Sequence, residues 1–181
     1  NKAIQEKYID FLRRLFKGIE PEKYMYLSLA QPSTHDQATA CGFWQNEDIE
    51  VFNQCGLYVN ETQYSENLRE RRQDRKNMLL AFEKQHILSE DDKANMLKTI
   101  ENGSEAPLTI EQKINVYCAK SNSALFLVRL NDVFRQKVLD NTPGTVQEYP
   151  NWRIKLSLSV EEIAAAKEFA VMMHLIKENR P

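Results

Sequence analysis

Two short, nearly continuous apolar runs constrain the fold of this chain more than any other feature. They are Tyr24–Ala30, "YMYLSLA", and Ala124–Leu130, "ALFLVRL", and they lie about 95 residues apart. Apolar runs without alternation are typical of parallel strands covered on both faces, and parallel strands are joined by helical crossovers. The sequence therefore predicts two buried parallel strands with helices between them.

Helical periodicity and capping pairs fill most of the remaining chain. A hydroxyl residue followed three positions later by Asp, Glu or Gln can satisfy the first free N–H groups of a helix. Helices are expected within residues 1–23, over about Gln63–Gln85, after Ser89 with Asp92, after Thr109 with Gln112, and as one last helix within 157–181 after Ser159 with Glu162. In that last helix one apolar face is expected, made by Ile163, Ala166, Phe169, Ala170 and Met173.

Two strands and about five to six helices make an α/β, helix-rich chain with too few strands for a complete parallel sheet. The chain also begins with Asn1 rather than methionine. Asn1 hints at a cut or processed fragment, although a disordered start left out of the sequence would look the same. The shortage of strands indicates the tail end of a larger α/β fold. The alternative is a helical domain in which the apolar runs are helices or lone strands.

Composition excludes several classes of function. The 181 residues carry a formal net charge of -2, so no overall field attracts nucleic acid, and no apolar run approaches a membrane span. Three cysteines without a CxxC pair favour a reducing, cytoplasmic setting, and no metal site is expected from their spacing to the histidines. The basic run Arg69–Lys76 is interleaved with acids, which predicts a solvated helix face.

An adjacent histidine and carboxylate follow the first apolar run, in "QPSTHDQATACGFW". If that run is a barrel strand, Thr34, His35 and Asp36 lie at its carboxyl end, where (β/α)8 barrels carry their catalytic groups. His and Asp side chains can together bind vicinal sugar hydroxyls, and a carboxylate favours an oxocarbenium-like transition state. The alternative is a helix start, with Thr34 or Asp36 as the cap and His35 half exposed.

A second polar segment, "DNTPGTVQEYPNWR", follows the second run. It supplies amide and aromatic side chains of the kinds that bind sugars by hydrogen bonding and stacking, namely Asn141, Tyr149, Asn151 and Trp152. The alternative is a structured loop in which Trp152 plugs the core.

Together these segments resemble the 4-alpha-glucanotransferases, or amylomaltases, of glycoside hydrolase family 77. "STHDQATACGFW" is similar to the family segment T-H-D-x-x-T-x-x-G-[FYW]-W, and "DNTPGTVQEYPNWRIKL" is similar to N-x-P-G-T…Y-x-N-W-R. "SNSALFLVRLNDVF" resembles the segment that carries the last barrel strand. The resemblance covers roughly Tyr24–Leu156 and implies the C-terminal part of a (β/α)8 TIM barrel.

The resemblance also implies roles for individual residues. Asp36 matches the carboxylate that grips the sugar at the cleavage point and stabilises the transition state. His35 matches the sugar-binding histidine beside it, and Asn141 matches an asparagine of the substrate groove. Trp152 and Arg153 match motif positions whose implied role is architectural.

The implied activity is transfer of an α-1,4-glucan segment between maltooligosaccharides, with glucose as an acceptor. It proceeds with retention through a covalent glycosyl-enzyme, and it needs no organic cofactor or catalytic metal. Its setting would be cytoplasmic maltooligosaccharide and glycogen metabolism, without nucleic-acid or membrane partners.

The family's nucleophile and general acid lie on earlier strands, and no family motif surrounds the acids of Asn1–Lys23. The chain alone is therefore expected to be inactive, as a single C-terminal portion whose partner is the missing N-terminal part of the enzyme. The alternatives are a non-catalytic glucan-binding remnant and a helical interaction domain.

Overall fold

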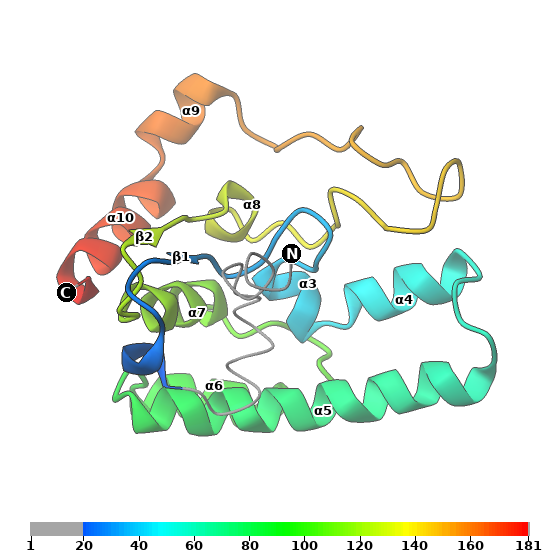
Figure 1. The fold of residues 1–181 in the computed structure, drawn as a ribbon, viewed down its shortest axis with the longest axis horizontal. Coiled ribbons are helices and arrows are strands. Elements are labelled where there is room, and N and C mark those ends of the chain that lie inside the picture. The colour runs from blue at the N-terminus through cyan, green and yellow to red at the C-terminus, as the bar shows by residue number, and fades with distance from the viewer. Residues whose placement is uncertain (1–19, 181) are drawn as a thin grey trace.

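The computed structural model describes residues 20–180. The helix expected within residues 1–23 lies outside them except for the 3-10 turn η1 (Pro21–Lys23). The other elements, in chain order (Figure 1), are β1 (Leu29–Ala30), α3 (Ala40–Trp44), α4 (Glu47–Gln54), α5 (Glu61–Lys84), α6 (Glu90–Thr99), α7 (Ile110–Ala119), β2 (Leu125–Phe126), α8 (Leu130–Val133), α9 (Val160–Ala165) and α10 (Lys167–Asn179).

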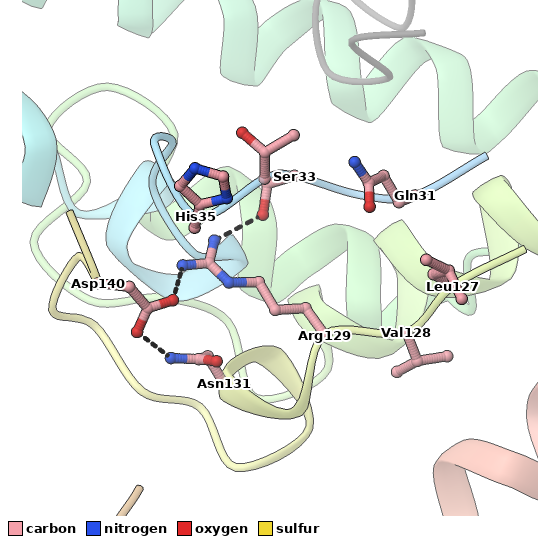
Figure 2. A pocket seen from close by; sticks show the side chains of 9 residues that line it. Gln31, Ser33, His35, Leu127, Val128, Arg129, Asn131 and Asp140 are labelled. Carbon is pink, nitrogen blue, oxygen red and sulfur yellow. Dashed lines mark hydrogen bonds and ion pairs between the residues drawn. The ribbon is translucent and has the colours of Figure 1, made fainter. Parts of the chain in front are cut away.

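The two apolar runs form adjacent parallel strands, as expected. Leu29 pairs with Leu125 and Ala30 with Phe126 in one two-stranded sheet. Because the strands are parallel, the segments that leave them start on the same side, and both line one pocket (Figure 2).

Two details of the strand prediction are wrong. Each strand is two residues long, not seven, and neither run is buried on both faces. Large apolar side chains of both runs are more than half exposed, namely Met25, Tyr26, Leu27, Leu125 and Leu127. The reason is that no third strand flanks this sheet anywhere in residues 20–180.

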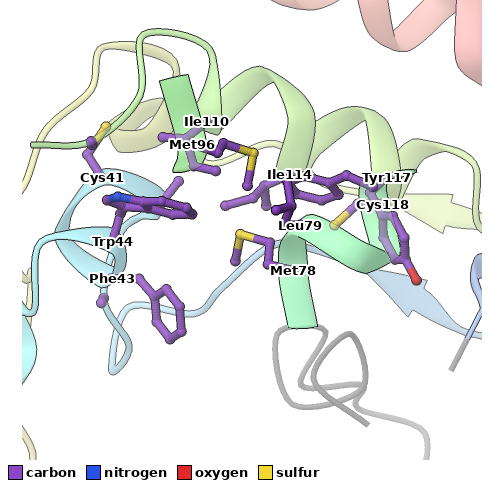
Figure 3. Close-up of a cluster of buried hydrophobic side chains, with 14 of the residues drawn as sticks. Cys41, Phe43, Trp44, Met78, Leu79, Met96, Ile110, Ile114, Tyr117 and Cys118 are labelled. Atoms are coloured by element: carbon purple, nitrogen blue, oxygen red, sulfur yellow. The ribbon is translucent and has the colours of Figure 1, made fainter. Parts of the chain in front are cut away.

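The core lies between the helices (Figure 3). It is built from side chains of α3, α5, α6 and α7 that include Trp44, Met78, Phe82, Met96, Ile110, Ile114 and Tyr117. Trp44 is fully buried and its indole N–H donates to Thr99 Oγ1 at 3.0 Å. A buried indole with a satisfied N–H anchors the short helix α3 on α6.

Helix α5 confirms the long charged helix expected over about Gln63–Gln85, and Arg69 and Arg72 of its basic run are exposed as predicted, but two of its arginines are not. Arg71 and Arg75 are 7% and 1% exposed. Arg71 donates to both Asp48 carboxylate oxygens, at 2.9 and 2.7 Å, and Arg75 donates to the carbonyl oxygen of Trp44 at 2.8 Å. Carbonyl groups of Phe43 and Trp44 at the end of α3 accept from the guanidinium groups of Arg71 and Arg75 on α5. Burial lowers the pKa of Arg75 to about 10.

The helix starts were only partly predicted. Ser89 with Asp92, and Ser159 with Glu162, form the expected capping boxes of α6 and α9. Thr109 precedes α7 without capping it, because its hydroxyl donates to Asp92 instead.

The last helix is not continuous. Ala166 is extended, with ψ 132°, and divides the expected helix into α9 and α10, so the apolar face predicted for one helix is interrupted. Arg180, after α10, donates to the carbonyl oxygens of Ala119 and Ser121 near the end of α7, which fixes the direction of α10. With α3, α4 and α8, which were also missed, residues 20–180 hold eight α-helices rather than five to six. None of them combines the length and apolarity that crossing a membrane requires.

A buried carboxylate connects α8 to the start of α3. Asp132 is fully buried, and its Oδ1 accepts the backbone N–H of Ala40 at 2.7 Å. Its Oδ2 has no hydrogen-bond partner within residues 20–180. Burial raises the pKa of Asp132 from 3.8 to about 6.

This carboxylate should make stability depend on pH. Between pH 4 and 6 the native protein holds the Asp132 proton while the unfolded chain has lost it, so this group lowers the free energy of unfolding as pH rises. Asp132→Asn keeps the acceptor for Ala40 but cannot ionise. We expect the variant to gain up to about 3 kcal/mol relative to the wild type between pH 4 and pH 7. Urea unfolding across that range measures this difference, and a constant difference would contradict it.

Candidate functional site

The His-Asp pair lies in a tight turn between β1 and α3. The N–H of Gln37 donates to the carbonyl oxygen of Thr34 at 3.1 Å, and the Gln37 side chain accepts the Thr34 N–H at 2.9 Å. Helix α3 begins only at Ala40, and its cap is Thr39, which accepts the N–H of Gly42. The alternative in which Thr34 or Asp36 caps a helix is therefore wrong, and the side chains of His35 and Asp36 are 54% and 43% exposed.

The fold brings the three predicted site residues together. The Asn141 side-chain amide donates to Asp36 Oδ1 at 2.6 Å, although the two residues are 105 positions apart. His35 Nε2 lies 3.3 Å from the same carboxylate oxygen. Asp36 and Asn141 thus meet near the ends at which the chain leaves the two strands, and both contacts are made by Asp36 Oδ1.

An arginine that the sequence analysis did not single out holds the two loops against each other. Arg129, just after β2, donates to Ser33 Oγ at 2.8 Å and to the carbonyl oxygen of Gln37 at 3.1 Å. It also forms an ion pair with Asp140 Oδ2 at 2.7 Å, while Asn131 donates to Asp140 Oδ1 (Figure 2). A charged residue inside the apolar run "ALFLVRL" was the available signal, since such residues are rarely buried unless paired.

A cavity of about 510 Å³ lies between these loops, next to the His-Asp turn. Its walls are made by residues that follow the two strands, namely Gln31, Ser33, Thr34, His35, Leu127, Val128, Arg129, Asn131 and Asp140. This volume is in the range of pockets that hold small molecules. Among residues 20–180, no group of three or more His, Cys, Asp or Glu side chains is placed to hold a metal ion.

Trp152 stands beside this cluster and does not plug the core. Its side chain is 65% exposed and its ring centroid lies 4.9 Å from that of His35. Tyr149 and Asn151, the other two predicted sugar-binding residues of this loop, form hydrogen bonds within the loop. The Tyr149 hydroxyl donates to the carbonyl oxygen of Leu139, and the Asn151 side chain accepts the N–H of Thr142.

The comparisons with known proteins agree with this architecture. The structure is similar to amylomaltase from Corynebacterium glutamicum, with a TM-score of 0.73 and 23% identity over 87% of this chain and 23% of that one. The family described as 4-alpha-glucanotransferase, glycoside hydrolase family 77, matches residues 8–160, a range wider than Tyr24–Leu156. The chain belongs to this family.

Curated relatives show how much of such a protein the chain represents. It is 31% identical over 128 residues to the 4-alpha-glucanotransferase of Haemophilus influenzae, and 25% identical over 136 residues to that of Mycobacterium bovis. These matches take in 68% and 75% of this chain but 17% of each relative. The chain therefore spans about one sixth of the length of the relatives it matches.

The ion pair between Arg129 and Asp140 should be strongly coupled, because the two side chains are only 10% and 23% exposed. Removing either charge leaves the other poorly solvated. We expect Arg129→Met and Asp140→Asn each to lower the free energy of unfolding by about 1–3 kcal/mol, with a coupling energy of about 1–2 kcal/mol. In a double-mutant cycle, urea unfolding of the wild type, the two single variants and the double variant measures this coupling energy.

The matched control is the surface pair Lys76–Glu101, whose nitrogen and oxygen atoms are also 2.7 Å apart but whose side chains are 42% and 61% exposed. Solvent screening should leave this pair with little coupling. Equal coupling in the two cycles would contradict the bridging role of Arg129.

Proposed function

We propose that this chain forms the part of a 4-alpha-glucanotransferase active site that grips the glucan and stabilises the transition state. The observation that carries the proposal is the cluster of His35, Asp36 and Asn141, with 2.6 Å between Asn141 Nδ2 and Asp36 Oδ1, beside two paired parallel strands. The cavity of about 510 Å³ between the two loops, which His35 helps to line, supports a site that holds a sugar.

The chain is proposed to be the C-terminal part of a (β/α)8 barrel. Parallel sheets occur with both faces covered and with neighbours at their edges. Here Leu27 and Leu125 are 76% and 64% exposed beside a sheet of two strands. The natural partner is therefore the polypeptide that supplies the other barrel strands, which fits a chain that spans about one sixth of its relatives.

Asp36 is proposed to act as a fixed negative charge. A pyranose ring flattens and gains positive charge at the anomeric carbon as the glycosidic bond breaks. Asn141 holds one carboxylate oxygen of Asp36. The other oxygen is proposed to accept from the hydroxyls of the bound ring. Since the charge on the sugar exists only in the transition state, this contact lowers the barrier more than it tightens substrate binding.

The reacting pair of carboxyl groups is proposed to come from the partner polypeptide. Retaining transfer needs a nucleophilic carboxylate and a carboxylic acid about 5 Å apart. The carboxylate in the cavity wall is Asp140, and Arg129 and Asn131 already occupy both of its oxygens. Asp140 is therefore a poor nucleophile, and Asp36 alone cannot complete the double displacement.

The isolated 181-residue chain should not disproportionate maltotriose. Without the nucleophile and the general acid, neither the glycosyl-enzyme nor the leaving glucose can form. Glucose release measured enzymatically should stay at the level of the buffer blank, with the Haemophilus influenzae relative as the positive control. Sustained glucose release by the pure chain would contradict the assignment of the missing pair.

Asp36→Asn tests the transition-state role in a complete barrel, made by joining this chain to the preceding part of the Haemophilus influenzae relative. We expect turnover to fall by roughly 10² to 10³, with a smaller change in maltooligosaccharide affinity. His35→Ala should cost less, because a neutral imidazole contributes a hydrogen bond without a full charge. Asp91→Asn, an exposed change on α6, is the control and should leave turnover unchanged.

Turnover of the Asp36→Asn chimera within about twofold of its parent would contradict the proposed role, since removing a charge that stabilises the transition state must slow turnover. A parent chimera that unfolds cooperatively and binds maltoheptaose, yet releases no glucose, would favour the non-catalytic glucan-binding alternative.

A further inference from the structure

We infer that Trp152 is an aromatic platform for a glucose ring, forming a glucan-binding position next to His35 and Asp36. This inference rests on the proposed function and deepens it, because it assigns a binding role to a residue whose motif position implies only an architectural one. Four observations carry it: the exposure of the indole, its backbone conformation, the bonds that hold its loop, and the groups beside it.

The exposure of Trp152 contrasts with that of the other tryptophan. Trp44 is fully buried with its N–H satisfied, whereas Trp152 is 65% exposed at the rim of the cluster. Tryptophan is highly buried on average, and exposed indole rings are enriched where a protein binds something. Packing within residues 20–180 therefore does not account for the position of this ring.

The backbone of Trp152 adopts a conformation that is unusual for a bulky side chain. Its φ is 62°, in the left-handed region that bulky side chains rarely occupy. Strained residues of this kind persist only where the surrounding structure holds them, and they cluster at ligand-binding positions. Trp152 combines this conformation with an indole whose ring centroid lies 4.9 Å from that of His35.

Hydrogen bonds on both sides of the loop keep the indole in place. The N–H of Trp152 donates to the carbonyl oxygen of Asp140 at 2.9 Å, and the N–H of Arg153 donates to that of Pro150 at 3.1 Å. The Asn151 amide donates to Thr145 Oγ1 at 2.8 Å while its oxygen accepts the N–H of Thr142. A loop backbone held in this way loses little entropy when a ligand packs on the ring that it carries.

The neighbours of the indole match the chemistry of a hexopyranose. The ring of His35 lies 4.9 Å from that of Trp152, tilted by 44°, and His35 in turn contacts Asp36. A glucose unit has a face of C–H groups and a rim of hydroxyl groups. The C–H face can pack on the exposed indole. The hydroxyl rim can then hydrogen-bond to the His35 imidazole beside the indole and to the Asp36 carboxylate beside His35.

The test uses the 181-residue chain and maltoheptaose as the probe. The tryptophan fluorescence of the wild type is compared with that of Trp152→Phe. The difference between the two spectra is the emission of Trp152, because both proteins keep Trp44. We expect acrylamide to quench the Trp152 emission in the free chain, and maltoheptaose to shift that emission to shorter wavelength and reduce its quenching. Trp152→Phe should show neither sugar effect.

Trp152→Gly separates binding from folding, because glycine accepts a positive φ without strain. We expect this variant to keep its urea unfolding midpoint but to bind maltoheptaose roughly tenfold more weakly in calorimetry. Val146→Gly, which also removes a large exposed side chain from the loop, is the matched control and should bind as the wild type does.

Each other outcome overturns the inference. If Trp152→Gly binds maltoheptaose as tightly as the wild type does, Trp152 is not a platform, while the proposed glucan site at Asp36 is unaffected. Emission that acrylamide does not quench in the free chain shows that the ring is covered by protein instead. Absence of maltoheptaose binding to the wild type overturns the glucan-binding part of the proposed function together with the platform.

Discussion

The ion pair between Arg129 and Asp140 is the interaction on which the candidate site depends. β1 and β2 bring the two loops to the same side, but backbone pairing ends at Ala30 and Phe126. Beyond that point Arg129 holds the first loop through Ser33 and Gln37, and the second through Asp140. Several hydrogen bonds offset the desolvation of the guanidinium group, as a partly buried ion pair requires.

Every residue assigned to sugar binding is positioned through this bridge. Asp36 and His35 lie on the turn that ends at Gln37, where Arg129 attaches, and Asn141 directly follows Asp140. The carbonyl oxygen of Asp140 also accepts the N–H of Trp152, so one residue fixes both the carboxylate cluster and the aromatic ring. An active site built from two loops needs a link of this kind, because small displacements of a catalytic group weaken its effect.

What the sequence could predict follows from the distance over which each interaction acts. The capping boxes at Ser89 and Ser159 involve residues three apart and were predicted. Thr109 shows the same spacing to Gln112 but does not cap, because its hydroxyl donates to Asp92, 17 positions away. The pairing of the two strands and the meeting of Asp36 with Asn141 followed from the topology of parallel strands and the order of the motifs. Burial of Arg71 and Arg75 could not be predicted, because it depends on carbonyl groups at the end of α3 that are distant in sequence. Trp152 was misassigned to the core in one interpretation because hydrophobicity does not show which way a loop presents its ring.

The crystal structure of this chain with maltoheptaose tests the central claim most directly, namely that the loop after β1 and the loop around Asn141 together form one glucan-binding surface. The account predicts a glucose unit whose hydroxyl oxygens lie within hydrogen-bonding distance of Asp36 and His35, about 2.6–3.2 Å, with Asn141 still bound to Asp36. Maltoheptaose bound elsewhere on the molecule, with the Asp36 carboxylate contacting only protein, would contradict it.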